Sequence, residues 1–267
     1  MDLGFPDDTR IGIAGDWHAS DWVGRVIPTF RRAGIRTIYQ LGDFGLRPDR
    51  GGQSFLNSVD YWCSRGEAIQ VVVTPGNHED WEWLTRLFAE SGGRPIQVSE
   101  AVTVLPRGWR WTLAGRSFVS LGGAPSVDRA IRRATRGFWS ATEAITAADV
   151  ARVVNGGHAE IMFTHDTPSV PETEAVRRVR IISEDPQFRW DEEDLLYAVV
   201  GAGLMAQAYA GVAPAVLAHG HYHVADSLTL EDGRRIFSVG KNGDRRGGAA
   251  VLDLADLSWQ WLNIGMR

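Results

Sequence analysis

The chain has one cysteine, one lysine and no excess of positive charge. Cys63 is the only cysteine among the 267 residues, which excludes a disulfide within the chain and a metal site built from several thiolates. A chain with one cysteine suits a reducing compartment, so we predict a cytoplasmic protein. The formal net charge is −5 and Lys241 is the only lysine, so no overall basic field attracts nucleic acid, although a local basic stripe is still allowed.

The sequence also lacks long apolar runs and export signals. No run approaches the length of a membrane span, and the chain begins MDLGFPDD, which is acidic where a secretory signal would be basic. We therefore expect no membrane contact and no processing. The 267 residues, 44% of them hydrophobic, suffice for one large domain with a full core. Because no repeat or long linker divides the chain, we predict a single domain over residues 1–267.

Short β-rich runs alternate with helical patterns along the chain. The runs cover residues 11–14, 37–40, 69–74, 161–164 and 215–218, and helix-like stretches at 22–33 and 55–64 separate the first three. A group at 102–105, 110–114 and 117–121 has tight turns, as in a meander, and a second such group covers 227–230, 235–239, 249–254 and 259–263. This order predicts an α/β fold in which two mixed β-sheets pack face to face with helices outside.

A polar motif follows each of the five runs that lie outside the two groups. The motifs are Gly15-Asp16-Trp17-His18, Gly42-Asp43, Gly76-Asn77-His78-Glu79, Thr164-His165-Asp166 and Gly220-His221-Tyr222-His223. Asp, Asn and His supply the oxygen and nitrogen donors that suit Mn, Fe or Zn, and no cysteine takes part. Two such ions about 3.5–4 Å apart are the usual means of in-line displacement at phosphorus. The motifs therefore predict a two-metal site at the carboxyl ends of the strands.

The spacing within the motifs has a physical basis. A glycine before an acidic or amide ligand lets the backbone turn sharply and approach the metals. Asp16 and His18 lie two residues apart, so in an extended strand end both point to one side, and His221 and His223 repeat this geometry. One such pair alone is more often a turn carboxylate beside a structural histidine. Five of the seven histidines fall in these motifs, however, which favours a metal site.

In this order the motifs resemble those of the calcineurin-like metallophosphoesterases, over the span from Asp16 to His223. The resemblance implies a four-layer α/β/β/α sandwich. It also implies two divalent ions, with Mn expected first and Fe or Zn accepted. One ion would be held by Asp16, His18, Asp43 and His223, and the other by Asp43, Asn77, His165 and His221. Asp43 would bridge, and His78 would face the phosphate and protonate the leaving oxygen.

Two divalent ions lower the pKa of a bridging water and neutralise charge on the phosphoryl oxygens. We therefore expect a bridging hydroxide to attack a phosphate ester in line. The leading prediction is a phosphodiesterase that acts on a nucleotide-type substrate. A phosphomonoesterase, including a protein Ser/Thr phosphatase, and a nuclease are the alternatives. A catalytically idle scaffold of the same fold would have lost ligand histidines, whereas here the full ligand set is present.

The chain departs from the protein Ser/Thr phosphatases after Gly42-Asp43. Those enzymes carry a second Asp that orients the catalytic histidine and then an Arg, whereas Leu46 and Arg47 stand here. Arg47 is thus a candidate phosphate clamp, with an exposed loop arginine as the alternative. The residue that orients His78 is left open.

Further arginines recur at helical spacing in the segment after Asp128. They are Arg129, Arg132, Arg133 and Arg136. In a helix they would form one cationic stripe that suits a polyphosphate, a nucleotide or a nucleic-acid backbone. The alternative is a solvated face neutralised by Glu143. Three aromatic residues, Trp17, Trp139 and Tyr222, are candidates for stacking on a base.

Overall fold

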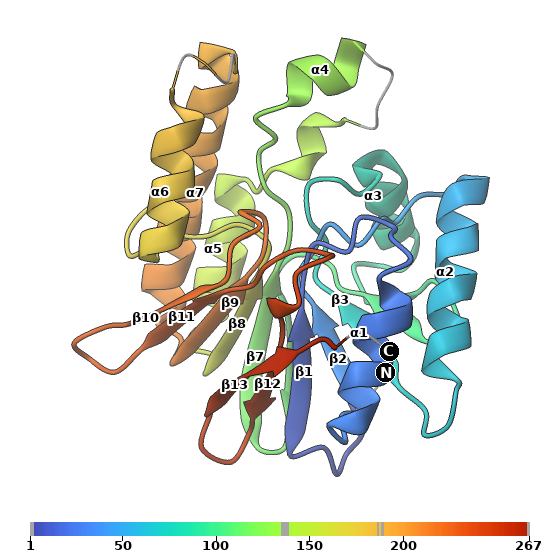
Figure 1. Cartoon of the computed structure of the whole chain (residues 1–267). Helices are drawn as coiled ribbons and strands as arrows, with labels where there is room; N and C mark the ends of the chain where they lie inside the picture. The colour runs from blue at the N-terminus through green and yellow to red at the C-terminus, as the bar shows by residue number, and fades with distance from the viewer. Residues whose placement is uncertain (1–2, 135–138, 186, 188–189, 266–267) are drawn as a thin grey trace.

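Two β-sheets lie face to face, and helices cover the outer side of each (Figure 1). The computed structural model describes residues 3–134, 139–185, 187 and 190–265. The first sheet has seven strands in the order β13-β12-β1-β2-β3-β5-β4. Their bounds are β1 (Arg10–Ala14), β2 (Thr37–Gln40), β3 (Gln70–Val73), β4 (Ile96–Gln97), β5 (Val102–Val104), β12 (Arg246–Asp253) and β13 (Trp259–Asn263). Because β1, β2, β3 and β5 run parallel, their carboxyl ends meet at one edge of the sheet.

The second sheet has six strands in the order β10-β11-β9-β8-β7-β6. Their bounds are β6 (Trp109–Leu113), β7 (Arg116–Leu121), β8 (Ile161–Thr164), β9 (Val216–His219), β10 (Asp226–Thr229) and β11 (Arg235–Ser238). Strands β7, β8, β9 and β11 are parallel, while β6 and β10 join antiparallel at the two edges. Both sheets are therefore mixed.

Three helices cover the first sheet, and others cover the second. Those on the first are α1 (Val23–Arg32), α2 (Arg50–Cys63) and α3 (Trp81–Glu90), and their buried residues form one cluster with Ile38, Val71 and Val73 of the sheet. On the second, α5 (Ala147–Asn155) and α7 (Glu192–Val212) cluster with Val119, Met162 and Leu217. The remaining helical segments are α4 (Arg129–Ala134), η1 (Ala141–Glu143) and α6 (Glu174–Ser183).

A third apolar cluster lies between the sheets. Ile11 and Ile13 of β1 and Tyr39 of β2 meet Phe118 of β7 and Phe163 of β8 there, all buried. Successive strand residues point to opposite faces, so the neighbouring Ile38 belongs to the cluster under the helices instead. These layers form the α/β/β/α sandwich of two mixed sheets that was predicted.

The strands agree with the sequence prediction more closely than their pairing does. β2, β8 and β13 have the predicted bounds. The predicted meander at 102–121 is wrong, because β5 pairs with β3 in the first sheet while β6 and β7 pair in the second. The C-terminal group is divided too, with β10 and β11 in the second sheet and β12 and β13 in the first. A short apolar run predicts a strand, but its partner is set by contacts far along the chain.

Helix α7 corrects a second expectation. An 18-residue window of this 21-residue helix has a mean hydropathy of 1.5, so by length and composition alone the helix could cross a membrane. Its second half packs in the core, where Met205, Ala208 and Val212 are buried. Its first half exposes Val199 and Val200 instead.

Candidate metal centre

The residues predicted as metal ligands lie at one edge of the two sheets. Asp16 and His18 follow β1, Asp43 follows β2 and Asn77 follows β3. From the second sheet, His165 follows β8, and His221 and His223 follow β9. Helices α4, α6 and α7 extend past this edge (Figure 1). The fold thus gathers residues that are far apart in the sequence.

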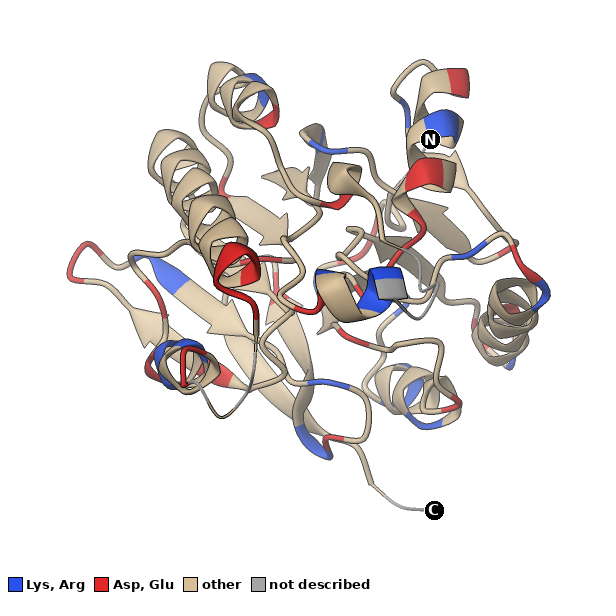
Figure 2. Cartoon of the chain, turned by 90° about the horizontal axis from the view of Figure 1, so that it is seen from above, with Lys and Arg blue, Asp and Glu red and all other residues tan. Residues whose placement is uncertain are grey.

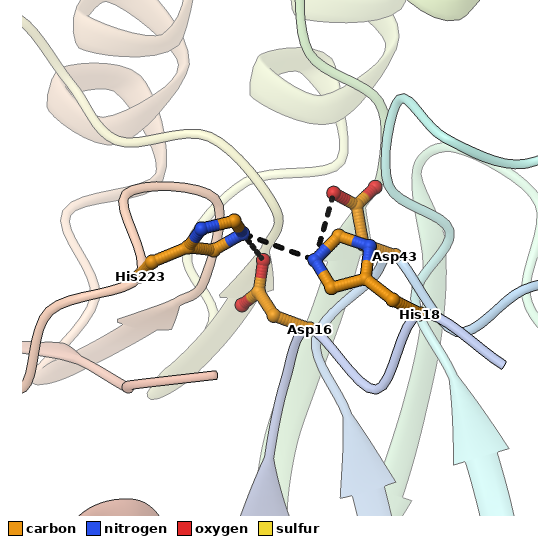
Figure 3. A group of neighbouring side chains, drawn as sticks. All are labelled: Asp16, His18, Asp43 and His223. Atoms are coloured by element: carbon orange, nitrogen blue, oxygen red, sulfur yellow. Dashed lines mark hydrogen bonds and ion pairs between the residues drawn. The ribbon is translucent and has the colours of Figure 1, made fainter. Parts of the chain in front are cut away.

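The first group of donors consists of Asp16, His18, Asp43 and His223, whose side chains point toward one another (Figure 3). One ligand atom from each lies within 4.8 Å of the others. The Nε2 atoms of His18 and His223 are 3.0 Å apart, and His223 Nε2 is 3.4 Å from Asp16 Oδ1. His18 Nε2 is 4.0 Å from Asp43 Oδ2. The group therefore presents two nitrogen and two carboxylate donors to one point.

The second group shares Asp43 with the first and adds His165 and His221. His165 Nε2 lies 3.2 Å from Asp43 Oδ1 and 2.9 Å from Asn77 Oδ1. The other ring nitrogen, His165 Nδ1, is 2.6 Å from the carbonyl oxygen of Leu41. An N–H donated to that carbonyl leaves the Nε2 lone pair directed at the shared site. Asp43 is thus the residue common to both groups.

These donors fit two divalent cations. Asp16 and Asp43 are buried carboxylates, which need compensating positive charge. Burial disfavours a charged His165, but the carboxylate of Asp43 outweighs it and raises the pKa of His165 to about 10, so a proton supplies that charge when no metal is bound. Burial also lowers the pKa of His221, whose Nδ1 is buried without a partner among the described residues. A neutral imidazole with a lone pair to offer is a suitable metal ligand.

The backbone that carries these residues is strained. Of the nine described residues other than glycine with positive φ, five are predicted ligands: Asp16, His18, Asp43, His221 and His223. Such angles, between 47° and 71° here, are uncommon for side chains of this kind and concentrate at functional sites. The extended geometry that was expected to let Asp16 and His18 chelate is therefore wrong. Left-handed turns bring the two side chains together instead.

The glycines of the motifs permit close approach, as predicted. Gly42 has φ 92°, and a Cβ there would overlap the ring of His165. A Cβ on Gly220 would overlap Oδ2 of Asp16. Any larger residue at either position would displace a ligand side chain.

Glu79 joins the loops that carry the ligands. Its buried carboxylate accepts hydrogen bonds from the backbone N–H groups of Asp43 at 3.2 Å, Gly45 at 3.0 Å and Gly76. The loops after β2 and β3 are thereby tied to one side chain. The sequence predicted this residue only as a neighbour of the ligands.

Asn77 is held by a buried polar network that the sequence did not predict. The Asn77 amide donates to Ser126 Oγ at 2.8 Å, and Arg132 donates to Ser126 Oγ, to the carbonyl of Asn77 and to Glu143. Burial raises the pKa of Glu143 to about 7, although Arg132 and hydrogen bonds from Ser126 and Trp139 act against it. Arg132 therefore positions a predicted ligand instead of facing solvent.

The other arginines of the predicted stripe each contact a different partner. Arg129 pairs with Asp194 at the start of α7, where Figure 2 shows acidic residues beside the arginines of α4. The Arg133 guanidinium lies over the ring of Trp139, 3.7 Å from its centroid. Arg136 is outside the described residues. Within the described part of the chain the predicted single cationic stripe is therefore not formed.

His78 lies beside the candidate metal donors. Its backbone N–H donates to Asp43 Oδ1 at 2.9 Å, and its ring Nε2 is 4.0 Å from Asp43 Oδ2. Leu46 is buried in the core and carries no group that orients this ring.

Two residues predicted to bind substrate, Arg47 and Trp17, do not line the cavity described next. Arg47 is half-buried ahead of α2. Trp17, proposed for stacking, is 1% exposed and belongs to the core.

A cavity of about 330 Å³ opens onto the donors. Its floor is formed by Asp43, Asn77, His78, His221 and His223. One wall comes from α6 and α7, with Val179, Arg180, Ser183, Leu195, Ala198 and Val199. The rest of the lining consists of Val127, Asp128, Glu184, Trp190 and Tyr222. This wall was not predicted from the sequence, although the apolar residues on all sides of α7 were a signal that could have indicated it.

The family model described as calcineurin-like phosphoesterase matches residues 9–225. No curated protein sequence matches the chain.

Solved structures of low sequence identity resemble the fold. A dimetal phosphatase from Danio rerio is 12% identical, with 96% of this chain and 99% of that chain covered and a TM-score of 0.49. The phosphopantetheinyl hydrolase from Mycobacterium tuberculosis is 16% identical, with 88% and 91% covered and a TM-score of 0.44. The assignment rests on the family match and not on these likenesses. The chain belongs to the calcineurin-like phosphoesterase family.

Proposed function

We propose that this chain is a phosphodiesterase that depends on two divalent metal ions. The family match and the two donor groups that share Asp43 support this proposal. Asp16, His18, Asp43 and His223 would hold one ion, and Asp43, Asn77, His165 and His221 the other. When bound, the ions would activate water and neutralise charge on the phosphoryl oxygens. Because the donors are nitrogen and oxygen, Mn is the ion we propose to test first, ahead of Fe and Zn.

His78 is the residue we propose as the general acid. Its side chain is 35% exposed on the floor of the cavity, and its Nε2 lies 4.0 Å from the shared Asp43. An imidazole at this place can hold a proton for the departing oxygen of the ester. Such assistance contributes about 10²- to 10⁴-fold to the rate.

The charge of the cavity favours a diester over a monoester. A monoester dianion carries more charge than a diester and gains more from a clamping arginine. Among the described residues that line the cavity, Arg180 is the only lysine or arginine, and it pairs with Glu172 at 2.6 Å. This is the observation on which the diesterase proposal depends. The nuclease alternative loses support because the predicted arginine stripe is not formed in the described chain. The nucleotide-type substrate and the cytoplasmic location stay predictions.

The test is hydrolysis of bis-p-nitrophenyl phosphate and p-nitrophenyl phosphate by metal-stripped protein with Mn²⁺ restored. We expect turnover of the diester to exceed that of the monoester and to disappear in Asn77→Ala. His78→Ala should lose about 10²-fold or more in kcat, whereas His158→Ala, at a histidine outside the site, should match the wild type. Preference for the monoester would establish a phosphatase instead. The absence of metal-dependent turnover of either ester would contradict the proposal.

A further inference from the structure

Helices α6 and α7 expose large apolar side chains near the candidate metal centre. Ile181 and Ile182 on α6 and Leu196, Val199 and Val200 on α7 are between 50% and 64% exposed. Of these five residues, Val199 lines the cavity at the candidate metal centre, and exposed apolar surface at a cavity commonly marks a binding site.

The apolar wall and the metal donors belong to one cavity. Val179, Leu195, Ala198 and Val199 line it together with His78 and His223. A phosphate placed at the donors therefore has this wall beside it. Whatever organic group is attached to that phosphate must pass along α6 and α7 or leave the cavity.

The charges of the wall discriminate between classes of organic group. Arg180 is already engaged by Glu172, and the other charged residues of the lining outside the metal centre, Asp128 and Glu184, are acidic. A second phosphate group would meet negative charge there, whereas a hydrocarbon would cover Val179, Leu195 and Val199. Burying apolar surface of both partners stabilises such a complex.

We propose that the ester group beside the scissile phosphate is a hydrocarbon chain that packs on the wall of α6 and α7. The inference rests on the proposed phosphodiesterase function and narrows it, since it replaces the nucleotide-type substrate with an alkyl-bearing one. Each methylene that leaves water for the wall should raise the affinity about fourfold.

The first measurement is calorimetric binding of methyl phosphate and octyl phosphate to the Mn²⁺-loaded protein, below the concentration at which octyl phosphate forms micelles. We expect octyl phosphate to bind on the order of a hundredfold more tightly, since several methylenes reach the wall. Equal affinities would overturn the proposal.

Two adjacent positions on α7 provide a matched pair of variants. Val199 lines the cavity and Val200 does not, yet they are 50% and 53% exposed, so neither substitution disturbs the core. Val199→Asn, which adds no charge, should weaken the binding of octyl phosphate about tenfold or more and that of methyl phosphate much less, while Val200→Asn should leave both unchanged. Equal effects of the two variants would show adsorption to the helix surface and would also overturn the proposal.

Turnover separates this inference from the function on which it rests. Methyl, octyl and thymidine 5′ esters of p-nitrophenyl phosphate are compared with Mn²⁺ present. We expect kcat/KM to be highest for the octyl ester. Turnover without preference for the octyl ester, or with preference for the thymidine ester, would refute the proposal that the wall binds a hydrocarbon chain. The proposal of phosphodiesterase activity would be retained. Tight binding of octyl phosphate without turnover of any diester would refute the proposed phosphodiesterase activity. The proposal that the wall binds a hydrocarbon chain would be retained.

Discussion

The side-chain amide of Asn77 donates a hydrogen bond to Ser126 Oγ at 2.8 Å, and this contact directs the amide oxygen toward His165. Ser126→Ala removes the contact without removing a ligand. We expect the affinity for Mn²⁺ to fall about tenfold, because partners of metal ligands typically contribute that much. Calorimetric titration of the metal-stripped protein measures it. Ser120→Ala is the control, since its buried hydroxyl contacts Thr74 instead of a ligand. Equal affinities of the two variants would contradict a positioning role for Ser126.

Gly220 provides a steric test of the site. A Cβ at this position would overlap Oδ2 of Asp16, so Gly220→Ala should move the carboxylate and weaken Mn²⁺ binding at least about tenfold. The matched substitution is Gly203→Ala in α7, where a Cβ meets nothing within 4 Å. That variant should bind Mn²⁺ as the wild type does and unfold at a higher temperature, because alanine favours a helix over glycine by about 0.5–1 kcal/mol. Unchanged Mn²⁺ affinity in Gly220→Ala would show that the site tolerates the extra carbon.

The shared position of Asp43 predicts how many ions each variant binds. The wild type should bind two Mn²⁺ per chain by equilibrium dialysis with metal analysis. Asp43→Ala removes a donor from both groups and should reduce binding at both sites. Asp16→Ala and His221→Ala each affect one group and should retain one ion. Loss of a single ion in Asp43→Ala would mean that the two sites do not share this carboxylate.

Glu143 predicts a pH dependence of stability. Its carboxyl has a folded-state pKa of about 7 against an ordinary value of 4.5, chiefly because it is buried. The folded protein therefore keeps this proton more readily than the unfolded chain. The resulting stabilisation is complete below about pH 4.5 and is lost as the pH rises through about 7. A shift of that size corresponds to about 3 kcal/mol.

Between pH 5 and pH 8 the free energy of unfolding should fall less in Glu143→Gln, which cannot ionise, than in the wild type. The expected difference between the two falls is about 3 kcal/mol. Urea unfolding of the metal-stripped proteins at both values measures the difference. Glu82→Gln, an exposed change in the first turn of α3, should follow the wild type. If Glu143→Gln and the wild type have parallel pH profiles, Glu143 is ionised throughout this range.

The strands and the set of candidate metal ligands could be predicted because both have local signals. β2 and β8 are runs of four fully buried residues; His165 follows β8 directly, and Asp43 is the third residue after β2. The parallel strands of each sheet end at a common edge, so residues after different strands are brought together. The family resemblance then assigned each residue to a group, and the two groups of donor atoms found in the structure have the same members apart from Asn77, which lies beside the second.

The remaining features depend on contacts that a local pattern does not contain. Arg132 and Arg133 are adjacent in the sequence, yet one is buried against Glu143 and the other lies over Trp139. Helical spacing predicted a shared face, whereas the alternative, neutralisation by Glu143, is found for Arg132 and not for Arg133. The left-handed backbone at Asp16 and His18 was missed for a related reason, since strand alternation was extended past the end of β1.

The carboxylate of Glu79 fastens the loops after β2 and β3 with hydrogen bonds from three backbone N–H groups. None of these hydrogen bonds uses a candidate metal-donor atom, so we expect the polypeptide to complete its fold before it takes up metal. Removal and replacement of the ions should then require no refolding, and the occupant of each site should follow from supply at the moment of loading. One preparation of the protein, stripped once with a chelator, can be converted into Mn, Fe and Zn forms by dialysis and compared as a single batch.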